Sequence, residues 1–356
     1  MAPVPVPTTR DPTATRGQLE RWLASIRPDQ GAVEVTLLGM PRQGLSSETI
    51  LFDATWSERV GPPGRYVARV RPTGYSLFME HDLEMQQLVL RALGPVPGIP
   101  VPEVIGYADE ATSPLGAPFF VMERIEGQAP RDHPPYTRAG WLFEARPEER
   151  RRLYDRSFDI LTRIHQVDWR AAGLDFMLER PDTQGGVAGQ LARDGAMLEW
   201  VAQGRTLEQF DEVHRWLRAY HPPPADPTLN WGDARLGNIL YRDFEPVAVL
   251  DWEMATIAPP EMDLGWWLGI ERNFTVGFGE RQPAGFPSEA EVIERFEERL
   301  GRQVVGFDFY RVWGSFRIAL LIFRLNDMMV ERGIIPAGSP EGAHLPAMRE
   351  LAAVTG

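Results

Sequence analysis

Short runs of β-branched and aromatic residues dominate the first 126 positions of the chain. Four runs have this character, which is typical of strands: residues 33–38, 49–56, 66–70 and 119–123. The turn-forming tetrapeptide G-P-P-G at 61–64 favours an antiparallel hairpin. One helical stretch, residues 77–93, interrupts the series and ends at Gly94-Pro95. The pattern predicts a small antiparallel sheet with one helix.

After Gly127 the apolar positions recur mostly at helical spacing. The stretches that we expect to be helices are residues 148–169, 189–203, 206–219, 289–300 and 308–330. A small sheet followed by a larger helical part is an α+β plan with two lobes, and a small ligand is expected in the cleft between lobes. We expect residues 1–17 to be a flexible lead-in, 18–126 an N-terminal lobe and 127–356 a C-terminal lobe.

Composition excludes several classes of function. The net charge is −13, whereas proteins that bind the nucleic-acid backbone usually carry the opposite sign. The chain has neither cysteine nor lysine, so thiolate chemistry, Schiff bases and a phosphate loop ending in Gly-Lys are excluded. No apolar stretch is long enough for a membrane span or resembles a signal peptide, and we expect a cytoplasmic protein that contacts no membrane.

Residues 230–263 hold the most informative pattern. Two short apolar runs, 239–241 and 247–250, flank a polar turn and predict a hairpin. If the turn centres between residues 244 and 245, Asn238 lies opposite Asp251, with Cβ atoms about 4.5–5.5 Å apart. Two oxygen ligands so placed can share one Mg²⁺ ion, which keeps its other positions for water or phosphate.

Asp233 and Arg235 precede this hairpin in a turn that Gly232 begins. A carboxylate here could accept the proton of an attacking hydroxyl group, and a guanidinium two residues later could neutralise charge on a phosphoryl group. Each residue taken alone also fits a turn or a strand end. The combined spacing favours a site for phosphoryl transfer.

The segments W-G-D-A-R-L-G-N and V-L-D-W-E resemble the aminoglycoside phosphotransferase-like small-molecule kinases, which share the protein-kinase fold. Within the family, the sequence of the first segment is most similar to actinobacterial members, which are related to the kinase-like domains fused to acyl-CoA dehydrogenases. The resemblance implies ATP and Mg²⁺ as cofactors, Asp233 as catalytic base, Arg235 as a contact of the γ-phosphate, and Asn238 and Asp251 as metal ligands.

The resemblance also implies roles for residues around the loop. Asp263 would support it, Glu253 would lie behind the metal ligands, and His165 would be a structural hydrogen-bonding residue. Trp231 stands where the family usually has a histidine, and we expect it to hold the loop by packing.

In the N-terminal lobe the resemblance implies a nucleotide site. Residues 39–49 resemble the loop that covers the nucleotide, where Ser46 and Ser47 would meet phosphates. Val67 and Arg69 share one strand face, and Arg69 stands where the family has a lysine.

Two further segments complete the expected nucleotide site. We expect Glu84 to point inward and pair with Arg69, because it shares a helix face with Leu77 and Leu88; Glu80 is the alternative. The backbone from Glu123 to Ile125 would bond adenine.

The chain is thus expected to move the γ-phosphoryl group of ATP to a hydroxyl group of a small molecule. The acceptor stays open between a hydroxylated metabolite, a hydroxyacyl thioester and an aminoglycoside-like compound. Acidic residues between 179 and 212 favour a cationic acceptor, while arginines between 131 and 156 favour the phosphates of a coenzyme A thioester. Because the strand lysine is absent, a pseudokinase-like nucleotide-binding or scaffold protein is the alternative.

Overall fold

A computed structural model of the protein describes residues 10–39, 47–58, 61–73, 76–179, 186–223, 225–336 and 345–355. The chain divides into two compact units. Unit 1 comprises residues 1–95 and 100–126, and unit 2 comprises residues 96–99 and 127–356.

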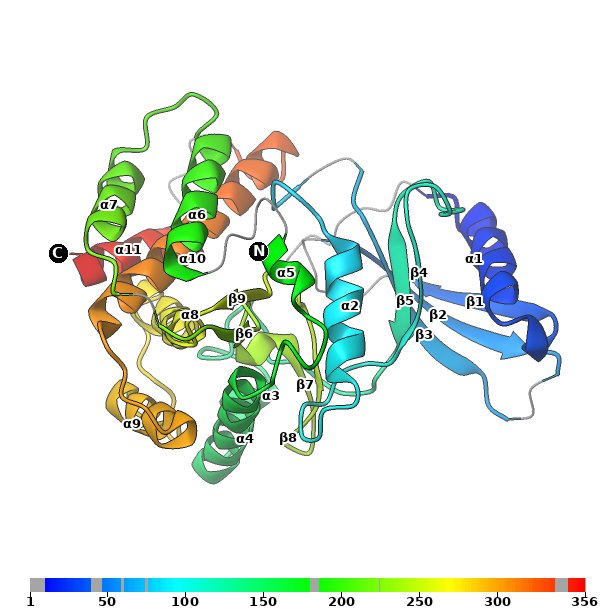
Figure 1. The fold of residues 1–356 in the computed structure, drawn as a ribbon, viewed down its shortest axis with the longest axis horizontal. Coiled ribbons are helices and arrows are strands. Elements are labelled where there is room, and N and C mark those ends of the chain that lie inside the picture. The colour runs from blue at the N-terminus through cyan, green and yellow to red at the C-terminus, as the bar shows by residue number, and fades with distance from the viewer. Residues whose placement is uncertain are drawn as a thin grey trace. The chain divides into compact units, whose positions relative to one another are not determined.

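Unit 1 is built on an antiparallel sheet of five strands in the order β1-β2-β3-β5-β4 (Figure 1). The strands are β1 (Val33–Gly39), β2 (Glu48–Trp56), β3 (Gly64–Val70), β4 (Val104–Ala108) and β5 (Phe119–Glu123). Helix α1 (Pro12–Ile26) packs on β1, and helix α2 (Leu83–Leu93) packs on β4 and β5. The core of the unit lies between α1 and the sheet.

Helix α1 corrects the expectation that the lead-in reaches residue 17. Asp11 caps the helix by accepting the backbone N–H of Ala14 at 2.7 Å, and Pro12 occupies the first turn, where its missing N–H costs nothing. Leu19 and Leu23 are fully buried in the core of unit 1. The proline- and threonine-rich composition concealed a capped amphipathic helix.

Unit 2 is mainly helical. Its helices are α3 (Trp141–Glu144), α4 (Pro147–His165), α5 (Phe176–Glu179), α6 (Gly186–Ala202), α7 (Glu208–Ala219), α8 (Glu261–Arg272), α9 (Glu289–Leu300), α10 (Phe307–Glu331) and α11 (Leu345–Thr355). Two small antiparallel sheets pair β6 (Thr228–Asn230) with β9 (Thr256–Ala258), and β7 (Ile239–Arg242) with β8 (Glu245–Val249). Short helical turns lie at Leu236–Asn238 and, as a π-helix, at Asn273–Gly277.

Helices α8 and α10 touch backbone to backbone (Figure 1). A Cβ atom built on Gly265 of α8 would collide with the backbone of Tyr310, and one built on Gly314 of α10 would collide with the backbone of Gly265. Both positions therefore need glycine, and the close approach fixes which side chains of the two helices meet.

The β7–β8 hairpin forms as expected, but its predicted register is wrong by one residue. The turn consists of Asp243 and Phe244, both with positive φ (52° and 65°), the geometry of a two-residue hairpin turn. A bulge between Leu240 and Tyr241 then shifts the pairing. As a result Asn238 accepts the N–H of Leu250 at 2.9 Å, and Asp251 lies one residue beyond.

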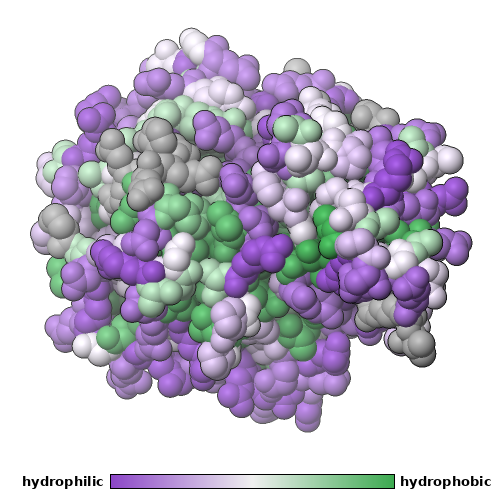
Figure 2. Space-filling view, turned by 45° about the vertical axis from the view of Figure 1, so that its right-hand side comes forward, coloured by the Kyte–Doolittle hydropathy of each residue, from purple (hydrophilic) through white to green (hydrophobic). Residues whose placement is uncertain are grey.

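In the view of Figure 2, hydrophilic side chains cover much of the visible surface, with smaller hydrophobic areas between them. Over the described ranges, every helix is too short or too polar to span a bilayer.

Candidate active site

Hydrogen bonds to Asp263 fix the loop between β6 and β7. The buried Asp263 carboxylate accepts the backbone N–H of Trp231 at 2.8 Å and that of Gly232 at 2.9 Å. His165 Nε2 lies 3.0 Å from Asp263 Oδ2. Gly232 has φ +88°, and a Cβ there would collide with the Met254 carbonyl, so only glycine fits. Asp263 and His165 thus have the supporting contacts that the resemblance implies.

The Asp233 carboxylate is held by three side chains in this loop and in α8. Arg235 Nε lies 3.2 Å from each of its oxygens. Asn238 Nδ2 donates to Oδ2 at 2.6 Å, and the indole N–H of Trp266 donates to Oδ1 at 3.1 Å. The Asp233 side chain is only 14% exposed. Its orientation is therefore fixed before any substrate arrives.

Burial raises the pKa of Asp233 above its ordinary value. The Arg235 guanidinium and the hydrogen bond from Asn238 act in the opposite direction, while the negative charge of Asp251 adds to the rise. A carboxylate with a raised pKa accepts a proton more readily than an exposed aspartate does. The effect of Asp251 on the pKa of Asp233 shows that the two carboxylates lie within electrostatic range of each other.

Arg235 is clamped between two carboxylates. Besides Asp233, its Nη1 donates to both oxygens of Asp132 at 2.7 Å. Asp132, Asp233 and Asp251 all raise the pKa of the Arg235 guanidinium against the cost of its burial. Asp132 precedes the loop by about 100 residues and has no pattern that marks it, so sequence reasoning missed this partner.

Asn238 and Asp251 fit a Mg²⁺ ion in chemistry and charge. The Asn238 amide nitrogen donates to the backbone carbonyl and to Oδ2 of Asp233, which leaves the amide oxygen as the atom that would face a metal ion. Three carboxylates, those of Asp132, Asp233 and Asp251, surround the single guanidinium of Arg235, which leaves an excess of negative charge. Mg²⁺ prefers oxygen ligands and typically takes few from the protein.

No group of three histidine, aspartate or glutamate side chains suited to a metal occurs over the described ranges.

Trp266 is a second residue that sequence reasoning missed. It follows Asp263 by three positions on α8, so both side chains point toward the loop. That helical spacing is the signal that could have found it. The neighbouring Trp267 points elsewhere and donates its indole N–H to the Tyr154 hydroxyl at 2.7 Å.

We expect Trp266→Phe to lower kcat about tenfold, because the carboxylate of Asp233 loses one of its donors. Loss of a donor to the charged form raises a carboxylate pKa, so the acidic limb of the pH–rate profile should move to higher pH. Trp267→Phe is the matched control, since it removes a buried indole bond that does not reach Asp233. Equal effects of the two variants on kcat and on the acidic limb would contradict the prediction.

Unit 1 carries the residues expected to contact nucleotide. Ser46 lies outside the described residues, and Ser47 accepts a hydrogen bond from Arg69 Nη2 at 3.1 Å. Val67 and Arg69 occupy alternate positions of β3, opposite Met122 and Phe120 of β5. Strand β3 therefore presents Val67 and Arg69 on the same face, as the alternation predicts.

The expectation that Glu84 points inward is wrong. Helix α2 begins at Leu83 rather than Leu77, so Leu77 lies outside the helix and cannot define its face. The inward face carries Leu83, Gln86 and Leu90 at helical spacing, whereas Glu84 is exposed in the first turn. Glu80 is also exposed, and the buried polar side chains of α2 are the uncharged Gln86 and Gln87.

The segment after β5 has part of its backbone already bonded. The N–H of Glu123 donates to Glu103 O at 2.9 Å, and the N–H of Arg124 donates to Arg65 O at 2.9 Å. An adenine ring would therefore have to use the amide of Ile125 or the carbonyl groups of this segment.

Comparisons with known proteins identify the family of the chain. The family model described as "Phosphotransferase enzyme family" matches residues 47–303. Acyl-CoA dehydrogenase family member 10 of Mus musculus is 27% identical over 266 residues, covering 72% of this chain and 24% of that protein. Member 11 of Rattus norvegicus is 27% identical over 265 residues, covering 71% and 32%. The chain thus spans a third or less of the length of these relatives.

Solved structures share the fold. A putative aminoglycoside phosphotransferase from Ralstonia eutropha JMP134 superposes with a TM-score of 0.68 at 23% identity, covering 97% of this chain and 96% of that one. A thermostable aminoglycoside phosphotransferase in a ternary complex with ADP and hygromycin B gives a TM-score of 0.52 at 15% identity, covering 95% and 98%. The predicted kinase-like α+β fold is confirmed. Since the family model covers well over half of the sequence, the chain belongs to the phosphotransferase enzyme family.

Proposed function

We propose that the protein transfers the γ-phosphoryl group of ATP to a hydroxyl group of a small molecule. The observation that carries this proposal is the buried constellation of Asp233, Arg235 and Asn238 on one loop, with Asp251 within electrostatic reach. Phosphoryl transfer needs positioned charges and a proton acceptor rather than covalent work by the protein. This loop supplies both.

In this proposal Asp233 accepts the proton of the acceptor hydroxyl as its oxygen attacks the γ-phosphorus. The bond between the γ-phosphorus and the bridging oxygen breaks, ADP leaves with that electron pair, and the proton stays on the Asp233 carboxylate. Arg235 balances charge on the transferred group by exchanging part of its contact with Asp132 for phosphate oxygens. When bound, Mg²⁺ would neutralise phosphate charge, and Asn238 and Asp251 would hold it.

The nucleotide contacts of unit 1 are part of the same proposal. Ser47 and Arg69, already bonded to each other, would face phosphates, and Val67 would pack against the base. Glu123 and Ile125 would offer backbone groups to adenine. Glu84 has no part in it, because its side chain is exposed.

Arginine in place of lysine at position 69 tests the nucleotide assignment. We expect Arg69→Lys to reduce ATP-dependent activity without abolishing it, because a lysine keeps the charge but loses the planar fork that can hold Ser47 and a phosphate together. The measurement is the KM for ATP, with the melting temperature as a check on folding. Arg71→Lys is the control, since Arg71 pairs with Glu110 at the surface. If Arg69→Lys fails to fold, Arg69 is needed for the structure of unit 1 and the nucleotide assignment is contradicted.

One feature favours a second candidate function, a nucleotide-binding protein without transfer activity. The usual lysine is replaced by Arg69, and the buried polar residues of α2 are the uncharged Gln86 and Gln87 rather than a glutamate.

ATP turnover separates the two functions. The protein is incubated with ATP labelled on the γ-phosphate and a panel of hydroxyl compounds, with and without Mg²⁺. Metal-dependent appearance of a phosphorylated acceptor supports the transferase. ATP binding with no labelled product for any acceptor would favour the second candidate.

A further inference from the structure

The acidic residues of α6 and α7, which could attract a cationic acceptor, are either exposed to solvent or hydrogen-bonded within the protein. Four acidic residues of α6 and α7 are exposed: Glu199, Glu208, Asp211 and Glu212. Asp182 lies outside the described residues. Asp194 is the buried acid of this region, and the indole of Trp313 and the amide of Gln190 donate to its two oxygens at 2.7 and 2.9 Å. These acids therefore give little support to a cationic acceptor.

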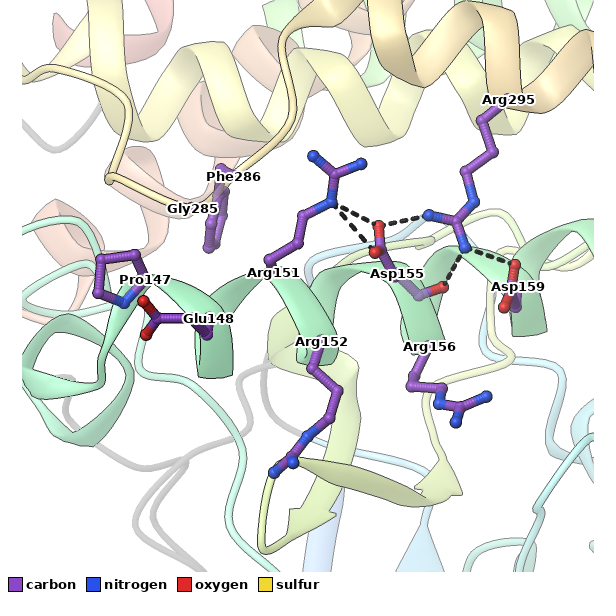
Figure 3. A pocket seen from close by; sticks show the side chains of 10 residues that line it. All are labelled: Pro147, Glu148, Arg151, Arg152, Asp155, Arg156, Asp159, Gly285, Phe286 and Arg295. Atoms are coloured by element: carbon purple, nitrogen blue, oxygen red, sulfur yellow. Dashed lines mark hydrogen bonds and ion pairs between the residues drawn. The ribbon is translucent and has the colours of Figure 1, made fainter.

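The arginines of α4 form hydrogen bonds and ion pairs with other residues of unit 2. Arg150 donates to backbone carbonyls, including Leu142 O at 3.0 Å. Arg151 pairs with Asp155, and Arg152 lies 3.5 Å from Glu245. Arg151 and Arg152 line a surface hollow of about 700 Å³ in which Asp155 and Asp159 pair with Arg295 (Figure 3). These ion pairs reduce the positive charge that a polyanion would meet at this surface.

Arg317 of α10 stands apart from these pairs. Its guanidinium packs against two indoles, with its central carbon 5.9 Å from the ring centroid of Trp266 and 5.4 Å from that of Trp313. The glycine contact between α8 and α10, at Gly265 and Gly314, sets this arrangement. Trp266 is also the donor to Asp233, so one indole touches both the proposed base and Arg317.

Arg317 forms one long ion pair, with the buried carboxylate of Asp194. The nearest carboxylate is Asp194, at 3.6 Å from Nε, beyond hydrogen-bond distance. Over the described ranges, the Arg317 guanidinium donates no hydrogen bond, and the side chain is 16% exposed. A guanidinium fork in this state is suited to a planar or tetrahedral oxyanion.

We propose that Arg317 binds a carboxylate or phosphate group of the acceptor, which is thus a hydroxylated anion rather than a polycation. The inference rests on the proposed function, because the acceptor hydroxyl must lie at Asp233. A short chain between the two groups would pass over the indole of Trp266, and the positive charge of Arg317 would repel an amine-rich acceptor.

The test compares acceptors that differ in one charged group: 1,3-butanediol with 3-hydroxybutyrate, glycerol with glycerol 3-phosphate, and choline as the cation. We expect kcat/KM at least about tenfold higher for an anion than for its neutral partner. The pair with the larger ratio tells whether carboxylate or phosphate is the natural group. No preference for either anion, or a preference for choline, would overturn the proposal.

Arg317→Gln should remove the preference, which is measured as the ratio of kcat/KM for the anion to kcat/KM for its neutral partner within the same variant. Arg324→Gln is the matched control, because Arg324 lies on the same helix over the ring of Trp200, two turns further on. If Arg317→Gln fails to fold, Arg317→Lys keeps the charge without the fork and should retain only part of the preference. A preference that survives in Arg317→Gln overturns the proposal.

Binding separates this inference from the proposed function. Calorimetric titration of the full chain with 3-hydroxybutyrate and with inorganic phosphate needs no turnover. Anion binding that depends on Arg317, without phosphorylation of any acceptor, would support the anion site and contradict the proposed transferase. If the protein phosphorylates acceptors but Arg317→Gln does not change anion binding, the proposed transferase is supported and the anion site at Arg317 is contradicted.

Discussion

Asp233→Asn is expected to slow phosphoryl transfer by about 10²–10⁴-fold, the usual effect of losing a general base. An asparagine keeps the shape of the side chain and can still accept the indole N–H of Trp266, but it cannot take the proton of the acceptor. Arg235 keeps its bidentate partner Asp132, so the loop should hold together. The measurement is the single-turnover rate with a saturating acceptor.

Two controls sharpen this experiment. In the wild type, activity should fall as the pH drops through the raised pKa of Asp233, because the protonated carboxyl group cannot act as a base. The acidic limb of the pH–rate profile that arises from protonation of Asp233 should be absent in Asp233→Asn. Calorimetry should give the same affinity for Mg-ATP in both proteins. Loss of nucleotide binding in the variant would show that Asp233 holds the nucleotide rather than the proton.

Asp251→Asn is expected to abolish the gain in ATP affinity that Mg²⁺ provides. Asparagine is chosen because Asp251 has φ +55°, a conformation that asparagine tolerates better than alanine. The neutral amide removes the carboxylate ligand and part of the negative charge that would attract the ion. Affinity is measured with ATP alone and with ATP plus Mg²⁺.

The control for Asp251 lies on the same hairpin. Asp243 also has a positive φ, 52°, but sits in the turn at the far end of β7 and β8. Asp243→Asn should leave both affinities unchanged. If Asp251→Asn keeps the full metal-dependent gain, Asp251 is not a ligand and the metal must be held elsewhere.

Local patterns predicted the parts of this molecule that local forces determine. The hairpin of β7 and β8 and the loop before it could be predicted because turn residues, strand formers and spacing lie within about 20 positions. The register could not be predicted, since a single bulge at Leu240 and Tyr241 shifts the pairing without a mark in the composition. The inward residue of α2 was missed for a similar reason, because the cap at Asp82 decides where the helix starts.

The contacts that complete the candidate site come from distant parts of the chain. Asp132 reaches Arg235 across about 100 positions, and nothing in its neighbourhood marks it as a partner. Trp266 could have been found from its spacing after Asp263, but only once the direction of Asp263 was known. Tertiary packing, rather than periodicity, supplies these residues.

The backbone contact of α8 with α10 bears on how this scaffold can diversify. Gly265 and Gly314 admit no side chain, so the two helices cannot slide past each other by substitution there. Arg317, three residues after Gly314 on α10, packs against Trp266 of α8, which in turn donates to Asp233. The proposed anion site and the proposed base therefore share one indole, so a substitution at Arg317 is expected to change the choice of acceptor and the rate of transfer together.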